Sequence, residues 1–190
     1  MIPVAFAHRR RVGKDTASNF LLTHLRLNGH RKAYRVSFAQ KMKQYCYELY
    51  GWSGLQQPEF YEREENAILR EIALQPIGKS PREIWIEFGM AGRAIYENTW
   101  IDLLFTSQKN ADVLIISDCR FLNEVNRIKE YGGAVIKIDR PGIEVSNDVA
   151  DSALADYTDW DAVITNDGDL KNLHKQVIDL TTKIKGLSIE

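Results

Sequence analysis

The sequence predicts an α/β fold in which a five-stranded parallel sheet carries helices on both faces. Five short apolar segments recur along the chain, and most are continuously apolar, as in strands that are buried on both faces. Amphipathic segments with helix start and stop signals alternate with them. With 190 residues the chain suits one domain with a substantial core, so we expect residues 1–190 to form a single domain.

The expected elements follow one another in order. The predicted strands are 3–7, 33–38, 113–117, 134–139 and 162–165. Asn28-Gly29 supplies a stop signal for the first helix, and Pro81 after Ser80 marks the start of a later one. The predicted helices are 13–27, 40–50, 59–74, 81–97, 100–107, 122–131 and 169–185.

The first strand leads into a cationic loop that closes on Gly13-Lys14-Asp15-Thr16. This strand–loop–helix order is typical of a phosphate-binding P-loop, in which backbone N–H groups and a helix N-terminus face a polyphosphate. Lys14 would reach the β- and γ-phosphates, and Asp15 or Thr16 would face a magnesium ion. A basic turn that caps an ordinary helix is the alternative interpretation.

Two positions depart from the usual pattern G-x-x-x-x-G-K-[ST]. His8 stands where the first Gly belongs, and Asp15 stands where the hydroxyl residue belongs. We therefore expect His8 to adopt a backbone angle that Gly takes freely. Its side chain either contacts a phosphate or shapes the loop.

Polar residues follow every predicted strand, at the sheet edge where α/β folds bind ligands. Asp118 follows the third strand and could hold magnesium or accept a hydrogen bond from an attacking phosphate oxygen, unless it caps the next helix. Arg120 could clamp a phosphate with its planar guanidinium, unless it pairs with Glu124. Similar residues follow the other strands: Ser37 to Lys43, Arg140, and Asn166-Asp167-Gly168.

A helix-rich insertion, about residues 39–111, separates the second and third strands. A kinase that acts on a second small substrate needs such an insertion for its acceptor, whereas a nucleotide switch does not. Arg82 and Arg93 are eleven residues apart and would share a helix face, which suits an acceptor phosphate. The alternative is a solvated helix face with Trp85, Phe88 and Ile95 in a core.

Composition excludes several classes of function. A net charge of −1 and a pI near 6.4 give no general attraction to nucleic acid or to a membrane surface. Cys46 and Cys119 follow no metal or redox spacing, and nothing requires a disulfide. No apolar run approaches the length of a membrane span and no signal peptide is visible, so we expect a cytoplasmic protein.

These motifs resemble those of the deoxynucleoside monophosphate (dNMP) kinases of tailed bacteriophages, within the P-loop nucleoside-phosphate kinase superfamily. The resemblance covers nearly the whole chain, and its most specific part is SDCRFLNEVNRIKEYGGAVIKIDRPG at 117–142. Other matching segments are GKDT at 13–16, SFAQKMK at 37–43, SPREIWIEFGMAGR at 80–93 and ITNDG at 164–168. It implies a three-layer P-loop kinase fold and γ-phosphoryl transfer from ATP to a dNMP, in the host cytoplasm if a phage encodes the chain.

The resemblance also implies roles for individual residues. Catalytic roles fall to Lys14, Asp118 and Arg120, and magnesium contacts to Asp15, Thr16 and Asp118. The residues expected to bind ATP are Arg10, Arg11, Val12, Gly13, Lys14, Asp15, Thr16, Arg140, Asn166, Asp167 and Gly168. The residues expected to bind the dNMP are Ser37, Phe38, Lys43, Arg82, Trp85, Gly89, Arg93 and Asp118.

Two other functions stay open at this point. One is another small-molecule kinase, such as a dephospho-coenzyme A kinase, and the other is a nucleotide-binding module without catalysis. The sequence does not fix the preferred base, the choice between deoxyribose and ribose, or the oligomeric state, although the size is compatible with a homodimer.

Overall fold

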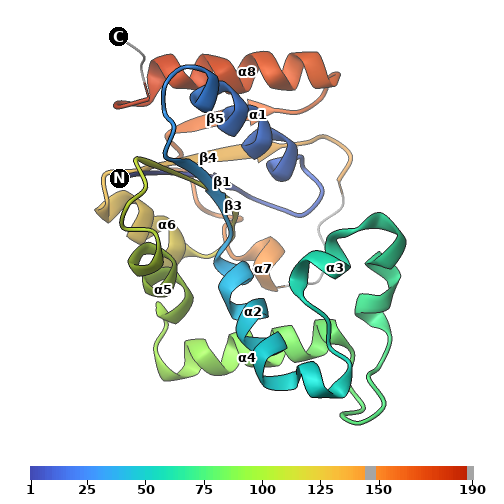
Figure 1. Ribbon diagram of the computed structural model, residues 1–190. Coiled ribbons are helices and arrows are strands. Elements are labelled where there is room, and N and C mark those ends of the chain that lie inside the picture. Colours follow the sequence, from blue (N-terminus) through green and yellow to red (C-terminus); the bar gives the residue numbers. More distant parts are fainter. Residues whose placement is uncertain (144–148, 188–190) are drawn as a thin grey trace. The chain divides into compact units, whose positions relative to one another are not determined.

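The computed structural model describes residues 1–143 and 149–187. The chain forms two compact units. Met1–Ser37 and Gln108–Glu190 make up the first unit, which holds the sheet, and Phe38–Ser107 make up the second, which is helical (Figure 1).

The first unit is built on a five-stranded sheet whose neighbouring strands all pair in parallel. The strand order is β2-β3-β1-β4-β5, so the first strand lies at the centre. The strands are β1 (Ile2–Ala7), β2 (Ala33–Val36), β3 (Val113–Cys119), β4 (Ala134–Asp139) and β5 (Ala162–Thr165). This arrangement confirms the predicted α/β fold with a parallel sheet.

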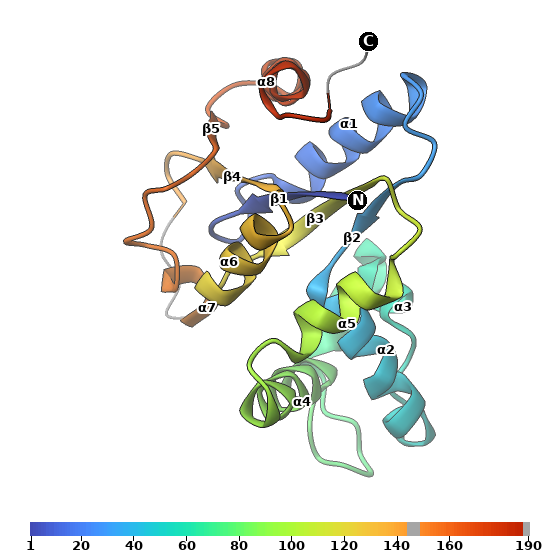
Figure 2. The same cartoon turned by 90° about the vertical axis from the view of Figure 1, so that its left-hand side faces the viewer.

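Helices cover both faces of the sheet, as Figure 2 shows. On one face lie α1 (Lys14–Leu27) and α8 (Leu170–Lys183), and on the other lies α6 (Leu122–Glu130). The core under α1 and α8 includes Phe6, Leu21, Ile136 and Val177, all withdrawn from solvent. A four-residue helix that the sequence did not predict, α7 (Val149–Ser152), precedes β5.

The second unit packs its helices around a core of its own. That core includes Met42, Cys46, Tyr61, Trp85 and Trp100. Its elements are α2 (Phe38–Tyr50), η1 (Gly51–Ser53), α3 (Pro58–Glu62), η2 (Glu64–Glu71), α4 (Pro81–Ile95) and α5 (Thr99–Ser107). The start of α4 is fixed by a capping box in which Ser80 and Glu83 each accept a hydrogen bond from the other's backbone N–H.

The single helix predicted over 59–74 is wrong. Arg63 adopts an extended backbone, with φ −71° and ψ 137°, and separates α3 from the 3₁₀ segment η2. The acidic run around this break and the lack of a buried residue within η2 explain the difference, because packing supplies most of a short helix's stability.

Three strands also differ from the prediction at one end, and β1 begins one residue early, at Ile2. β2 stops at Val36, and Phe38 begins α2 instead of ending the strand. β3 continues to Cys119, which pairs with Ala7 after a register shift in β1, so Asp118 belongs to the strand itself. No helix in residues 1–143 or 149–187 is long and apolar enough to span a membrane.

Candidate active site

The loop between β1 and α1 follows the backbone course expected of a phosphate loop. Three of its residues have positive φ angles: His8 at 95°, Arg11 at 60° and Gly13 at 104°. The prediction that His8 adopts a glycine-like angle is therefore confirmed. Its buried ring lies against the end of β4, where Nδ1 is 3.2 Å from the carbonyl oxygen of Ile138, so in this structure the side chain shapes the loop.

Lys14 is the first residue of α1, and its ammonium group turns back into the loop. Lys14 Nζ donates to the carbonyl oxygen of His8 at 2.9 Å and to that of Arg9. Only 6% of the residue is exposed, and burial, together with the nearby Arg120 guanidinium, lowers the pKa of Lys14 to about 8. Asp15, Asp151 and Asp118 act in the opposite direction, so the ammonium lies within the field of three carboxylates.

Asn166 ties this loop to the end of β5. Its side-chain amide donates to the carbonyl oxygen of Val12 at 2.8 Å, while its backbone N–H donates to the backbone carbonyl oxygen of Asp139. A Cβ atom on Gly13 would lie 2.6 Å from the same amide nitrogen, so Gly13 is needed both for its positive φ and for this close contact. Asn166 thus meets the phosphate loop, as its place after β5 suggested.

Asp118 is half-buried near the end of β3 and accepts a hydrogen bond of 2.8 Å from the hydroxyl of Ser37. It does not cap α6. Glu124 takes that role, because its carboxylate accepts hydrogen bonds from the backbone N–H groups of Arg120 and Phe121. The residue at the N-cap position of α6 is Phe121, so the alternative that Asp118 caps this helix is wrong.

The guanidinium of Arg120 faces Asp151, a residue to which the sequence analysis assigned no role. Arg120 Nη1 lies 3.6 Å from Asp151 Oδ1, and the backbone N–H of Arg10 donates to the same oxygen at 3.2 Å. Asp151 lies 141 residues beyond Arg10 in the sequence, so sequence spacing gave no reason to place it at the loop. Arg9 belongs to the cationic loop but was given no individual role, and its buried Nε has no hydrogen-bond partner among the described residues.

The two candidate magnesium ligands of α1 lie differently. The exposed carboxylate of Asp15 pairs with the guanidinium of Arg35 on β2, whereas Thr16 is half-buried. Arg35 also donates to Asn19 at 3.4 Å. Other predicted contacts at this edge of the sheet are exposed to solvent: Arg11, Arg140, Asp167 and Gly168.

The predicted acceptor residues of the second unit gather on α2 and α4. Lys43 Nζ lies 4.9 Å from the centre of the Trp85 ring, a cation–π contact within the core of that unit. Arg82 Nη1 donates to Glu71 at 3.1 Å. Arg93 is half-buried and lies on the same continuous helix as Arg82, three turns away.

Two glycines of α4 differ in their surroundings. The carbonyl oxygen of Gly89 accepts a hydrogen bond of 2.9 Å from the indole N–H of Trp100. A Cβ atom at Gly92 would lie 2.5 Å from Trp100 Cζ2, so the indole packs directly on the glycine. The group that approaches the backbone of α4 at Gly92 is therefore the indole of Trp100.

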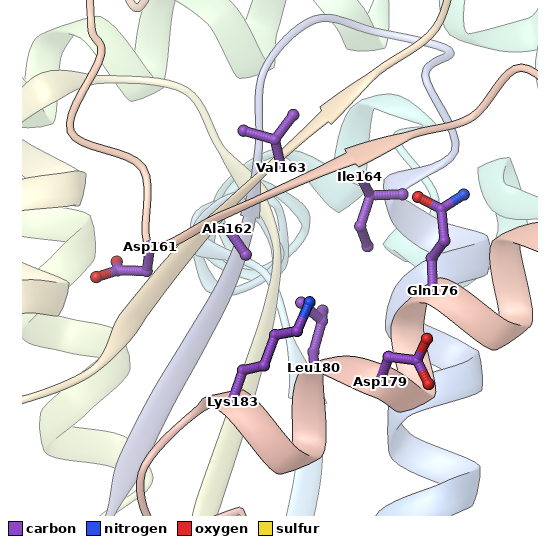
Figure 3. A pocket seen from close by; sticks show the side chains of 8 residues that line it. All are labelled: Asp161, Ala162, Val163, Ile164, Gln176, Asp179, Leu180 and Lys183. Atoms are coloured by element: carbon purple, nitrogen blue, oxygen red, sulfur yellow. The ribbon is translucent and has the colours of Figure 1, made fainter.

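A pocket of about 240 Å³ lies between β5 and α8 (Figure 3). Its polar lining residues are Asp161, Gln176, Asp179 and Lys183. The lining residues in the described part of the chain include none of those predicted to bind ATP or the dNMP. The phosphate loop is therefore a separate feature of this unit.

The comparisons with known proteins decide the family. The family model described as "Deoxynucleotide monophosphate kinase" matches residues 90–177. A protein of Acanthamoeba polyphaga mimivirus, named as a candidate deoxynucleotide monophosphate kinase, is 32% identical over 181 residues, which cover 87% of this chain and 89% of that protein. The chain belongs to the deoxynucleotide monophosphate kinase family.

Membership in the deoxynucleotide monophosphate kinase family confirms the predicted enzyme class. A kinase of this family uses ATP as its phosphoryl donor. The matched residues 90–177 include Asp118, Arg120 and Asn166 but begin well after the P-loop, which lies near the N-terminus. The roles of individual residues remain predictions.

Proposed function

We propose that the protein transfers the γ-phosphoryl group of Mg-ATP to the 5′-phosphate of a deoxynucleoside monophosphate. The bond between the γ-phosphorus and the bridging oxygen of ADP breaks, and a bond to an acceptor phosphate oxygen forms, which yields ADP and a dNDP. The observation that carries the proposal is the gathering of Asp118, Arg120 and the P-loop around Lys14 in a chain of this family.

Phosphoryl transfer asks the protein to align two oxygens and to neutralise developing charge. Lys14 is suited to the second task because it already points into the loop, where it donates to backbone carbonyl oxygens. Phosphate oxygens would replace these acceptors when ATP binds. The unpaired Nε of Arg9 and the N-terminus of α1 supply further donors for an anion at this point.

The donor set at the loop suits magnesium. Mg²⁺ prefers oxygen ligands and is often held by one or two carboxylates together with substrate phosphates. Asp118 offers a half-buried carboxylate that Ser37 holds in place, and Thr16 offers a hydroxyl in the first turn of α1. The ion would neutralise charge on the β- and γ-phosphates. Asp15 is the weaker candidate, because it pairs with Arg35.

The cationic side chains of the helical unit support placing the dNMP-binding site there. Arg82 and Arg93 lie on one side of α4, and paired guanidinium groups suit a phosphate. Lys43 adds a third charge beside the Trp85 ring. Arg82 now pairs with the half-exposed Glu71, an interaction that an acceptor phosphate would outcompete because exposed ion pairs contribute little.

The decisive experiment measures ADP release from Mg-ATP with each of the four common dNMPs, the matching NMPs and dephospho-coenzyme A. We expect release that depends on one or more dNMPs and disappears in Lys14→Ala. Turnover with dephospho-coenzyme A alone would favour the other kinase class. ATP binding without any acceptor-dependent turnover would contradict the proposal and leave a binding module.

Arg93→Ala tests the acceptor assignment. We expect the KM for the dNMP to rise about tenfold or more while kcat changes less, because a ground-state contact with the acceptor is removed. Arg63→Ala is the matched control, since Arg63 is an exposed arginine of the same unit. An unchanged KM for the dNMP in Arg93→Ala would remove this residue from the acceptor site.

A further inference from the structure

Asp151 is a buried charged residue to which the proposed phosphoryl transfer assigns no role. Its side chain is only 3% exposed, although it belongs to a short helix at the surface of the sheet unit. An unpaired buried carboxylate would be costly, so its partners are informative. They include Arg10 of the phosphate loop and Arg120, which follows β3.

A single oxygen of Asp151 joins these two segments. Oδ1 accepts a hydrogen bond from the backbone N–H of Arg10 at 3.2 Å, and the Nε of Arg10 lies 3.8 Å away. The Nη1 of Arg120 lies 3.6 Å from the same oxygen. Both guanidinium contacts are longer than a hydrogen bond and are charge pairings between Asp151 and the two arginines.

The position of this carboxylate sets the charge balance around the loop. Lys14, Arg10 and Arg120 bring three cations to the phosphate site, and Asp15, Asp118 and Asp151 bring three anions, of which Asp15 pairs with Arg35. Asp151 therefore offsets the repulsion among the cations before any phosphate is present. A bound polyphosphate would then meet arginines that are already held in place, which lowers the cost of ordering them.

A role in stability alone explains this arrangement less well. The segment around α7 already contributes a buried apolar side chain to the sheet unit, because Leu154 is only 4% exposed. A buried ion pair is weak evidence for stability, since desolvation offsets much of its attraction. Both partners of Asp151 also belong to segments that meet the phosphate site.

We propose that Asp151 is a positioning residue for phosphoryl transfer, which holds the phosphate loop at Arg10 and aims the Arg120 guanidinium at the transferred phosphoryl group. The inference rests on the proposed function. Asp151 does not touch the reacting atoms and acts through these two residues.

The test compares Asp151→Asn with the wild-type enzyme in the dNMP-dependent assay. We expect kcat to fall about 30-fold or more while the KM for ATP changes less than about threefold, because misaimed groups cost transition-state stabilisation. Asp151→Glu retains the charge at a shifted position and should have a kcat between those of Asn and wild type. Asp156→Asn, an exposed aspartate nearby in sequence, is the matched control and should retain full activity.

A double-mutant cycle separates positioning from a structural role. In an Arg120→Ala background, Asp151→Asn should lower kcat by less than about threefold, because residues that act together are not additive. An equal loss in both backgrounds, or a kcat of Asp151→Asn within twofold of wild type, would overturn the inference. If Asp151→Asn does not fold, Asp151→Glu takes its place in the cycle. A kcat of Asp151→Glu equal to that of the wild type would then overturn the inference.

Failure of the proposed function can be told apart from failure of this inference. If no dNMP supports turnover in the wild-type protein, the affinity for ADP with aluminium fluoride, a mimic of the transferred phosphoryl group, still reports how Arg120 is aimed. Asp151→Asn should bind this complex about tenfold or more weakly than wild type. Equal affinity would overturn the positioning role.

Discussion

Lys14 Nζ donates a hydrogen bond of 2.9 Å to the carbonyl oxygen of His8, the residue that occupies the first glycine position of the phosphate loop. The contact closes the loop on itself across six residues. It depends on the positive φ of His8, which turns the backbone of this position. The loop is therefore preorganised by its own lysine, and phosphate binding would exchange one set of oxygen acceptors for another.

ATP affinity should fall above pH 8. Burial lowers the pKa of Lys14 to about 8, so the free protein loses this charge as the pH rises, whereas bound phosphates favour the charged form. We expect ATP affinity to drop by up to about tenfold per pH unit between pH 8 and the higher pKa of the bound state. Isothermal titration from pH 7 to 9.5 measures this.

Two comparisons make the pH experiment specific to Lys14. Burial raises the pKa of the Cys46 thiol to about 12 and raises that of Cys119 as well, so neither thiol should titrate in this window. Lys14→Ala should bind ATP weakly and with little change over the same range. A wild-type affinity that stays constant to pH 9.5 would contradict the role of Lys14.

Asp118→Asn should lower kcat by about 100-fold or more while the fold survives. The amide keeps the shape of the side chain and can still accept from the Ser37 hydroxyl, but it loses the negative charge proposed to serve magnesium and the transferring group. Steady-state kinetics with saturating substrates provides the measurement. Asp112→Asn, an exposed aspartate just before β3, is the control, and near wild-type turnover in Asp118→Asn would refute the role.

His8→Gly should be more stable than His8→Ala by about 1 kcal/mol. Both changes remove the imidazole and its contact with the carbonyl oxygen of Ile138, so that loss cancels in the comparison. Only alanine keeps a Cβ at a φ of 95°, where L-residues are strained. Urea unfolding of the two variants gives the difference, and an alanine variant as stable as the glycine variant would show that the loop relaxes.

The sequence predicted the sheet well because buried parallel strands are encoded locally. β4 and β5 match the predicted segments 134–139 and 162–165, and the other three strands differ only at their ends. The positive φ of His8 was also predictable, since its position in the motif dictates a backbone turn. In each case the deciding residues are neighbours in sequence.

Features that depend on distant partners were not predictable in the same way. The side chain of His8 faces Ile138, and Asp151 meets Arg10, across 130 and 141 residues respectively. The failed helix over 59–74 has a related cause, because helical spacing of apolar residues predicts a helix only where packing holds them. The structure of residues 59–74 depends on tertiary contacts rather than on local helix preference.

Gly92→Ala should destabilise the helical unit, whereas Gly89→Ala should be tolerated. A Cβ at Gly92 would lie 2.5 Å from Trp100 Cζ2, and the indole is held by its hydrogen bond to the carbonyl oxygen of Gly89, so relief requires that the core repack. A Cβ at Gly89 would lie 3.7 Å from Met42 Cε, an ordinary contact, and alanine favours a helix over glycine by about 1 kcal/mol.

We expect Gly92→Ala to lower the free energy of unfolding by about 1–3 kcal/mol and Gly89→Ala to leave it unchanged or raised. Thermal unfolding of both variants, followed by tryptophan fluorescence, tests the pair with one measurement. The two substitutions add the same methyl group to the same helix, so helix propensity cancels and the difference reports the contact with Trp100. Equal stabilities would mean that the indole moves aside at little cost, and the close packing of α4 on Trp100 would then not be a determinant of this unit.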